Sequence, residues 1–367
     1  MKMKKPSASL KKHASILSIS AICALTLAAC GGSDSSSSGG TSGGGTVTAK
    51  NAFAYISQRG AAADTGSVLR CDLDATSGDL SGCTDSGAGT ALPGPISLAL
   101  NDKYAYILNF PVGSDPATNP TAETITQCSL DGTTGALSNC VNSGANETAY
   151  IFDFAINGNF GYTLQRFGNQ LLQCTLDATT GALSNCGGTA ASGLSEPVNF
   201  VFKDSRVYIA NADLSASSVS VCTVASDTGA VSDCKTAIPS SYNFNPTSTD
   251  NGVTTINGVG PTGIAIKDST AYIVSSANKN VIRCEVGSDG TFTSCVDNAL
   301  AGITASSPYR IGVYGNYAYI TNASTTAADN NVFKCSINSD NSLGTCAAAG
   351  ASNIGSELDD IKFLAKP

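Results

Sequence analysis

The sequence predicts an all-β protein, a six-bladed β-propeller whose blades are four-stranded antiparallel sheets. Three observations lead to this prediction. A hairpin pattern with two cysteines recurs six times, and a short strand containing tyrosine comes before every copy. An apolar strand comes before five of the tyrosine strands, and a sixth apolar segment of the same kind remains at the C-terminus.

The hairpin is clearest over residues 169–187, where Leu172, Cys174 and Leu176 alternate with other residues and lead into a turn and a return strand. One turn position holds glycine in five copies and asparagine in the sixth. Both residues tolerate a positive φ, so all six copies are expected to form the same turn. The copies span residues 68–83, 124–140, 169–187, 218–234, 280–295 and 331–346, with turn residues Gly78, Gly135, Gly181, Gly229, Gly290 and Asn341.

The strands upstream of the hairpins predict how the ring closes. The tyrosine strands are at 54–56, 105–107, 161–163, 207–209, 271–273 and 318–320, and the leading apolar strands are at 96–100, 151–156, 198–202, 263–266 and 309–313. The first unit lacks a leading strand, and segment 359–365 is its expected counterpart. A propeller closed by pairing 359–365 with 53–57 explains this arrangement, because one blade is then split between the two ends of the chain.

Three tyrosine strands also carry a family resemblance. YILN (106–109), YIAN (208–211) and YITN (319–322), each followed by a cysteine hairpin, resemble the YVTN-type propeller repeats of bacteria. This broad group includes seven-bladed lactonase-like propellers. The resemblance covers about residues 50–367 and implies the propeller fold. The present sequence departs from the lactonase-like pattern in its six units and its paired cysteines, so lactonase activity does not follow.

The N-terminus predicts export and lipid anchoring. Residues 1–29 combine a basic start with a short apolar stretch, as in a signal peptide. Leu27, Ala28, Ala29, Cys30 and Gly31 resemble the lipobox of bacterial lipoproteins, which implies acylation of Cys30 and an outer-membrane lipoprotein facing either side. An ordinary secretory signal is the alternative. Residues 30–49 form a Gly/Ser-rich tether, and 50–367 form one propeller domain, expected to be a monomer.

The charge excludes nucleic acid as an expected partner. Residues 30–367 carry 15 Lys and Arg against 28 Asp and Glu, a net charge of −13. Binding to a phosphate backbone requires clustered basic residues. The acidic charge is interpreted as keeping an exported protein soluble.

The cysteines predict a disulfide in every blade. Of 14 cysteines, Cys23 lies in the signal peptide and Cys30 is the lipidation site, which leaves two per hairpin. Intra-blade disulfides are typical of an exported protein, whereas thiolate metal clusters need closer spacing. The predicted pairs are Cys71–Cys83, Cys128–Cys140, Cys174–Cys186, Cys222–Cys234, Cys284–Cys295 and Cys335–Cys346.

No catalytic motif is found. The only histidine, His13, lies in the signal peptide, which excludes Ser-His-Asp, Cys-His and His-ligated metal sites from the mature chain. No catalytic residue, metal site or cofactor is predicted. A carboxylate mechanism, with Ca²⁺ or Mg²⁺ in the channel, stays open.

The irregular loops predict a binding face. The connections 109–123, 235–260 and 321–330 vary in length and emerge on one face, whereas the other turns are uniform. Drift in loop length is the alternative. A ring of polar residues, interpreted first as loop caps and second as ligand-binding residues, lies near this face: Gln58, Asn109, Gln165, Asn211, Ser275 and Asn322.

Charged residues on the innermost strands form a second candidate site, consisting of Asp153, Arg310, Asp359, Asp360 and Lys362. A structural ion pair between Arg310 and Asp360 or Asp359 is expected first, and a polar ligand in the channel second.

Three functions remain from these observations. The first is a non-catalytic propeller that binds a protein or glycan at the cell envelope. The second is a hydrolase or lactonase-like enzyme that uses carboxylates and a divalent cation. The third is an assembly scaffold without a small ligand.

Overall fold

The structure is a computed structural model that describes residues 50–60, 65–89, 92–111, 123–145, 151–238, 242, 244, 247–250, 253–256, 260–305, 307–324, 330–352, 354–355 and 357–367. Strands and turns account for the described chain, and no helix in it has the length and apolarity to cross a membrane. The signal peptide, Cys30 and the tether lie outside the described residues.

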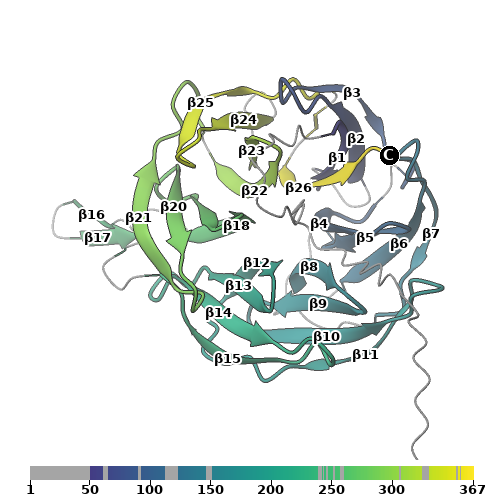
Figure 1. Cartoon of the computed structure of the whole chain (residues 1–367), viewed down its shortest axis with the longest axis horizontal. Helices are drawn as coiled ribbons and strands as arrows, with labels where there is room; N and C mark the ends of the chain where they lie inside the picture. Colours follow the sequence, from purple (N-terminus) through teal and green to yellow (C-terminus); the bar gives the residue numbers. More distant parts are fainter. Residues whose placement is uncertain are drawn as a thin grey trace, which may run out of the picture. The chain divides into compact units, whose positions relative to one another are not determined.

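Six four-stranded antiparallel sheets are arranged as blades in a ring around a central axis, which confirms the predicted fold class (Figure 1). Each blade begins with its innermost strand. Blade 1 contains β26 (Leu358–Ala365), β1 (Ala52–Gln58), β2 (Ser67–Leu73) and β3 (Leu80–Asp85). Blade 2 contains β4 (Pro95–Leu100), β5 (Tyr104–Asn109), β6 (Thr124–Leu130) and β7 (Leu137–Asn142). Blade 3 contains β8 (Ile151–Asn157), β9 (Phe160–Gln165), β10 (Gln170–Leu176) and β11 (Leu183–Gly188).

The second half of the ring repeats this order. Blade 4 contains β12 (Pro197–Lys203), β13 (Arg206–Asn211), β14 (Ser218–Val224) and β15 (Val231–Thr236). Blade 5 contains β18 (Pro261–Lys267), β19 (Thr270–Ser275), β20 (Asn280–Val286) and β21 (Phe292–Asn298). Blade 6 contains β22 (Pro308–Tyr314), β23 (Tyr317–Asn322), β24 (Asn331–Ile337) and β25 (Leu343–Ala348).

The C-terminal strand closes the ring as predicted. β26 pairs antiparallel with β1, from Ala52 opposite Ala365 to Gln58 opposite Leu358. All seven residues of β1 are buried, because the strand is covered on both faces by neighbouring blades. The ends of the chain therefore share one blade, and the ring has no open junction.

The repeated tyrosines join neighbouring blades. Each is fully buried, and five of their hydroxyls donate to a carbonyl oxygen in the hairpin turn of the next blade. These bonds run from Tyr55 to Gly135, Tyr106 to Gly181, Tyr162 to Gly229, Tyr272 to Asn341 and Tyr319 to Gly78, at 2.6–3.0 Å. The tyrosine strand of one blade and the hairpin of the next therefore form a single repeated contact around the ring.

This contact explains the turn glycine more fully than backbone conformation alone. Gly135 has a φ of 69°, and Asn341, at the same place in blade 6, has a φ of 62°. A Cβ atom added to Gly135 would lie 2.7 Å from the ring of Phe53 in blade 1. The position needs a left-handed residue, and at Gly135 it also needs one without a side chain.

All six predicted disulfides are present, each between the two outer strands of one blade. Their Cα atoms are 4.0–4.1 Å apart. Disulfides persist in oxidising compartments, so this set indicates an extracytoplasmic location.

The long connection between blades 4 and 5 contains structure that the sequence analysis missed. β16 (Thr247–Asp250) and β17 (Val253–Ile256) form an antiparallel hairpin that lies outside the ring in Figure 1. Before it, Phe244 is buried in the core between these blades, and Tyr242 packs against the same core. The Asn-Gly pair at 251–252 was an overlooked hairpin signal, because this dipeptide favours a two-residue turn.

Candidate functional site

Six equivalent residues, one per innermost strand, line the channel at the same height. Each lies two residues before the residue that pairs with the buried tyrosine of its blade. This channel ring consists of Asp360, Ser97, Asp153, Asn199, Gly263 and Arg310, in order from blade 1 to blade 6.

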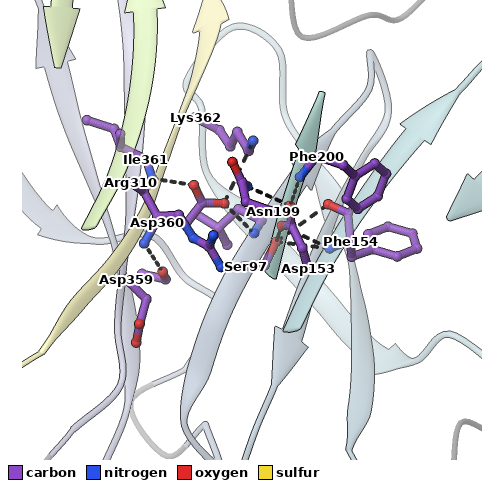
Figure 2. Close-up of polar contacts among 12 residues, drawn as sticks. Ser97, Asp153, Phe154, Asn199, Phe200, Arg310, Asp359, Asp360, Ile361 and Lys362 are labelled. Carbon is purple, nitrogen blue, oxygen red and sulfur yellow. Dashed lines mark hydrogen bonds and ion pairs between the residues drawn. The ribbon is translucent and has the colours of Figure 1, made fainter. Parts of the chain in front are cut away.

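Four members of the channel ring accept a hydrogen bond from a backbone N–H of the next blade. Asp360 accepts from Leu98 at 2.9 Å, and Ser97 accepts from Phe154 at 3.2 Å. Asp153 accepts from Phe200 at 2.9 Å, and Asn199 accepts from Ile264 at 2.7 Å. These side chains hold the innermost strands of blades 1–5 together, as Figure 2 shows for Ser97 with Phe154 and for Asp153 with Phe200.

Asp153 is buried without an ion pair among the described residues. Its carboxylate instead accepts four hydrogen bonds, from the Ser97 hydroxyl (2.6 Å), the Asn199 amide (2.6 Å) and the N–H groups of Phe200 (2.9 Å) and Phe154 (3.1 Å). Several charge-assisted hydrogen bonds compensate the lost hydration of a buried carboxylate. Asp153 therefore has a structural role in the ring.

The two remaining members of the channel ring, Gly263 of blade 5 and Arg310 of blade 6, do not accept a hydrogen bond of this kind. Gly263 has no side chain to offer, and a Cβ atom there would lie 2.8 Å from the Tyr309 carbonyl oxygen and 2.9 Å from the Arg310 Cα. The close approach of the two blades therefore requires glycine. Arg310, only 1% exposed, extends its guanidinium to backbone carbonyls of two other blades, donating to Thr262 through Nη1 and to Phe152 through Nη2 at 3.2 Å.

The expected ion pair of Arg310 with Asp360 or Asp359 is wrong. No carboxylate of the described chain forms an ion pair with Arg310. The comparison of the repeats nevertheless correctly gave Arg310 and Asp360 equivalent positions on neighbouring innermost strands. The Asp360 carboxylate accepts instead from the N–H groups of Leu98 and Ile361 and lies 3.8 Å from the Lys362 amine. Figure 2 shows Arg310 without a bond to either aspartate. Backbone groups have replaced the expected charge partner.

Beside Arg310, towards the ends of the strands that bear the irregular loops, lies a group of charged and aromatic residues. We call Arg59, Tyr309, Arg310 and Asp359 the mouth cluster. Asp359 is 6% exposed, and its Oδ2 has no hydrogen-bond partner. The Nε atoms of Arg59 and Arg310 are also buried without a partner.

The electrostatics of the mouth cluster centre on Asp359. Burial raises the pKa of its carboxyl to about 7, although Arg59 and Arg310 act to lower it and Glu357 and Asp360 act to raise it. Burial likewise raises the pKa of the Tyr309 hydroxyl, on which Arg310, Asp359, Arg59 and Arg166 also act. These residues therefore lie close enough to influence one another. Sequence analysis identified Asp359 and Arg310 but missed Arg59 and Tyr309.

Four of the six polar residues that follow the tyrosine strands make loop-capping contacts. Asn322 and Asn211 accept from the N–H groups of Ser307 and Ser195, Ser275 accepts from Asn278, and Gln58 accepts from Gly355. Asn109 donates to Ile107 and Thr126, and Gln165 lies half-buried at the end of β9. A binding role for these six residues stays a prediction, since these contacts need no ligand.

A groove of about 480 Å³ opens on the loop face of blade 5. Asn278, Asn280, Asp297, Leu300 and Ile303 contribute to its lining. The Asp297 carboxylate accepts a hydrogen bond from the hydroxyl of Tyr242, which precedes the β16–β17 hairpin. The groove and the hairpin connection therefore meet at Asp297.

No candidate metal site is found in the described chain, because no three His, Cys, Asp or Glu side chains in it converge. Much of the loops 109–123 and 321–330 lies outside the described residues.

No family model and no curated protein matches the sequence. Similar solved structures share the fold at low identity. A nidogen/laminin complex structure contains a chain with 13% identity and a TM-score of 0.58, over 86% of this chain and 98% of that one. A putative 6-phosphogluconolactonase from Bacteroides uniformis has 14% identity and a TM-score of 0.53, over 86% and 99%. The periplasmic gluconolactonase of Pseudomonas aeruginosa has 12% identity and a TM-score of 0.53, over 86% and 100%.

Proposed function

We propose that this protein is a lipid-anchored propeller of the bacterial cell envelope that binds a protein or glycan partner through its loop face, without catalysis. Cys30 carries the lipid and the Gly/Ser segment tethers the ring to the outer membrane. The six disulfides and the propeller likeness support the location and the scaffold. The lipobox pattern supports the anchor.

The observation that carries the proposal is the insertion between blades 4 and 5. Phe244 anchors it in the core and Tyr242 bonds Asp297, while β16 and β17 extend beyond the ring. Asp297 also lines the groove of blade 5. A rigid scaffold that displays an anchored hairpin beside a groove is a common arrangement for recognition.

The test removes the hairpin alone. Thr247 and Ile256 are paired neighbours, so a two-residue Gly-Gly link can replace residues 247–256 without pulling the ends apart. Wild-type and excised full-length proteins are used to capture partners from solubilised, chemically crosslinked envelopes, followed by mass spectrometry. We expect specific partners with the wild type and their loss on excision, with an unchanged melting temperature. Equal capture by both proteins would contradict a role for the hairpin.

A second candidate function, hydrolysis in the channel, is favoured by Asp359. A carboxyl with a pKa of about 7 beside two guanidinium groups suits general acid–base chemistry near neutral pH. The likeness to a gluconolactonase suggests D-glucono-1,5-lactone as the test substrate. Turnover that is abolished by Asp359→Asn would support the enzyme, whereas hydrolysis no faster than the spontaneous rate leaves the binding function as the better account.

A further inference from the structure

We propose that the mouth cluster is a saccharide site, in which neighbouring hydroxyls of a neutral sugar bond Asp359 and the arginines while the sugar ring lies against Tyr309. This inference rests on the proposed binding function and names the ligand chemistry of the channel end of the loop face.

The first step is the set of unused hydrogen-bonding groups. Asp359 Oδ2 is an acceptor without a partner, and the Nε–H groups of Arg59 and Arg310 are donors without one, although all three atoms are buried. Buried polar atoms in folded proteins are nearly always paired, with protein, water or ligand. A ligand that pairs all three groups must donate one hydrogen bond and accept two. A pair of sugar hydroxyls does both, because each hydroxyl has one donor and two acceptor positions.

The second step is access. Tyr309 and Arg59 are each only partly buried, so the cluster has an edge in contact with solvent. The Arg310 guanidinium lies 4.7 Å from the centre of the Tyr309 ring. Two further aromatic rings adjoin arginines of this region. The Arg59 guanidinium lies 4.9 Å from the ring centre of Phe110, and the Arg166 guanidinium lies 5.0 Å from that of Phe152. The centres of these two phenylalanine rings are 5.7 Å apart. Aromatic surface with a few fixed polar groups is typical of small-molecule sites.

The third step is charge, which separates a neutral ligand from an acidic one. The cations in this region are Arg59, Arg310 and Lys362, and the carboxylates besides Asp359 are Glu357, Asp360 and Asp153. Arg166 is already bonded to Glu196 at 2.8 Å. With Asp359 protonated, three positive charges face three negative ones, and ionisation of Asp359 adds a fourth negative charge. An added anion would leave a negative excess in a poorly hydrated place, which is costly, whereas a neutral polyol adds no charge.

The experiment measures binding of methyl α-D-glucoside, methyl α-D-galactoside, methyl α-D-mannoside and maltotriose to the purified full-length protein in detergent. Saturation-transfer NMR detects weak binding and calorimetry gives the affinity. Sodium gluconate is the acidic comparison. The monosaccharides and maltotriose distinguish a site for single sugars from one for longer glycans. We expect saturable binding of at least one neutral probe, and weaker binding of gluconate.

Three variants test the site. Tyr309→Leu should weaken neutral-sugar binding about threefold to tenfold, as expected for losing an aromatic contact. Arg59→Met should weaken it about tenfold to a hundredfold, as expected for losing a hydrogen bond from a charged group. Asp359→Asn should also weaken it. The matched controls are Tyr104→Leu and Arg70→Met, whose side chains donate to hairpin-turn carbonyls away from the cluster. The controls should bind as the wild type does.

Three outcomes would overturn the inference: no binding of any neutral probe, tighter binding of gluconate, or equal binding by wild type and Tyr309 and Arg59 variants. A failure here is separable from failure of the proposed function. Partner capture that depends on the β16–β17 hairpin would persist if only the saccharide site were wrong.

Discussion

Replacing Asp359 by asparagine should stabilise the protein at alkaline pH and leave it unchanged at acidic pH. The carboxyl has a pKa of about 7 in the fold against 3.8 in its ordinary state, because burial disfavours the charged form. The folded protein therefore holds this proton between pH 4 and 7 while the unfolded chain releases it. The contribution of Asp359 to the free energy of unfolding therefore falls as pH rises through this window and is constant above it.

The magnitude follows from the shift. A difference of about three units at roughly 1.4 kcal/mol each gives at most about 4 kcal/mol of destabilisation above pH 7. Asparagine has no charge to bury, so Asp359→Asn removes this penalty. The pKa of Asp360 is also raised, chiefly by burial, and its contribution remains in both proteins. The difference between wild type and variant therefore isolates Asp359.

The assay is urea unfolding of both proteins, with disulfides intact, at pH 5, 6, 7 and 8. The variant should be more stable than the wild type at pH 8, and the difference should shrink towards pH 5. Asp74→Asn is the control, because Asp74 is exposed and its pKa is lowered by the N–H groups of Ser77 and Thr76. Its effect should not change over this range. A wild-type stability that stays constant from pH 5 to 8, or a variant no more stable at pH 8, would refute the reasoning.

Two further predictions concern the ring. Deleting residues 357–367 removes β26 and should lower the melting temperature of the whole propeller, measured by near-UV circular dichroism, because blade 1 loses its innermost strand; melting like the full-length chain would contradict closure by β26. Gly135→Ala should cost ~1–3 kcal/mol for its positive φ, plus the contact with Phe53, in urea unfolding. Gly132→Ala, in the same hairpin with open space around it, should cost under ~0.5 kcal/mol, and equal effects of the two changes would argue against the contact.

The repeats made the fold predictable because each unit carries the same local sequence features. Alternating strands, a turn residue with positive φ and a cysteine pair recur with constant spacing, so strand order, disulfides and the split blade follow from counting. The hairpin at Thr247–Ile256 belongs to an insertion that has no counterpart in the other units, so the repeat pattern does not predict it.

The candidate site was less predictable because its contacts are between blades. Comparing the repeats correctly gave Arg310 and Asp360 equivalent positions on neighbouring strands. The direction of each side chain, however, depends on which other hydrogen-bonding groups lie within its reach. Asp360 is occupied by the Leu98 and Ile361 N–H groups, and Arg310 reaches Thr262 and Phe152 carbonyls instead. Backbone N–H and carbonyl groups occur along the whole chain, so the sequence does not show which of them will bond a given side chain.

The most direct test of a loop-face binding module compares the two faces of the ring. Benzoylphenylalanine is placed at Phe167, a 55% exposed loop-face residue, and at Asp102, an exposed residue in a turn on the opposite face. Cells expressing each full-length protein are irradiated, and crosslinked species are separated and identified. We predict a discrete crosslinked partner from position 167 and none from position 102. The same partner from both positions, or from position 102 alone, would contradict the proposed binding face.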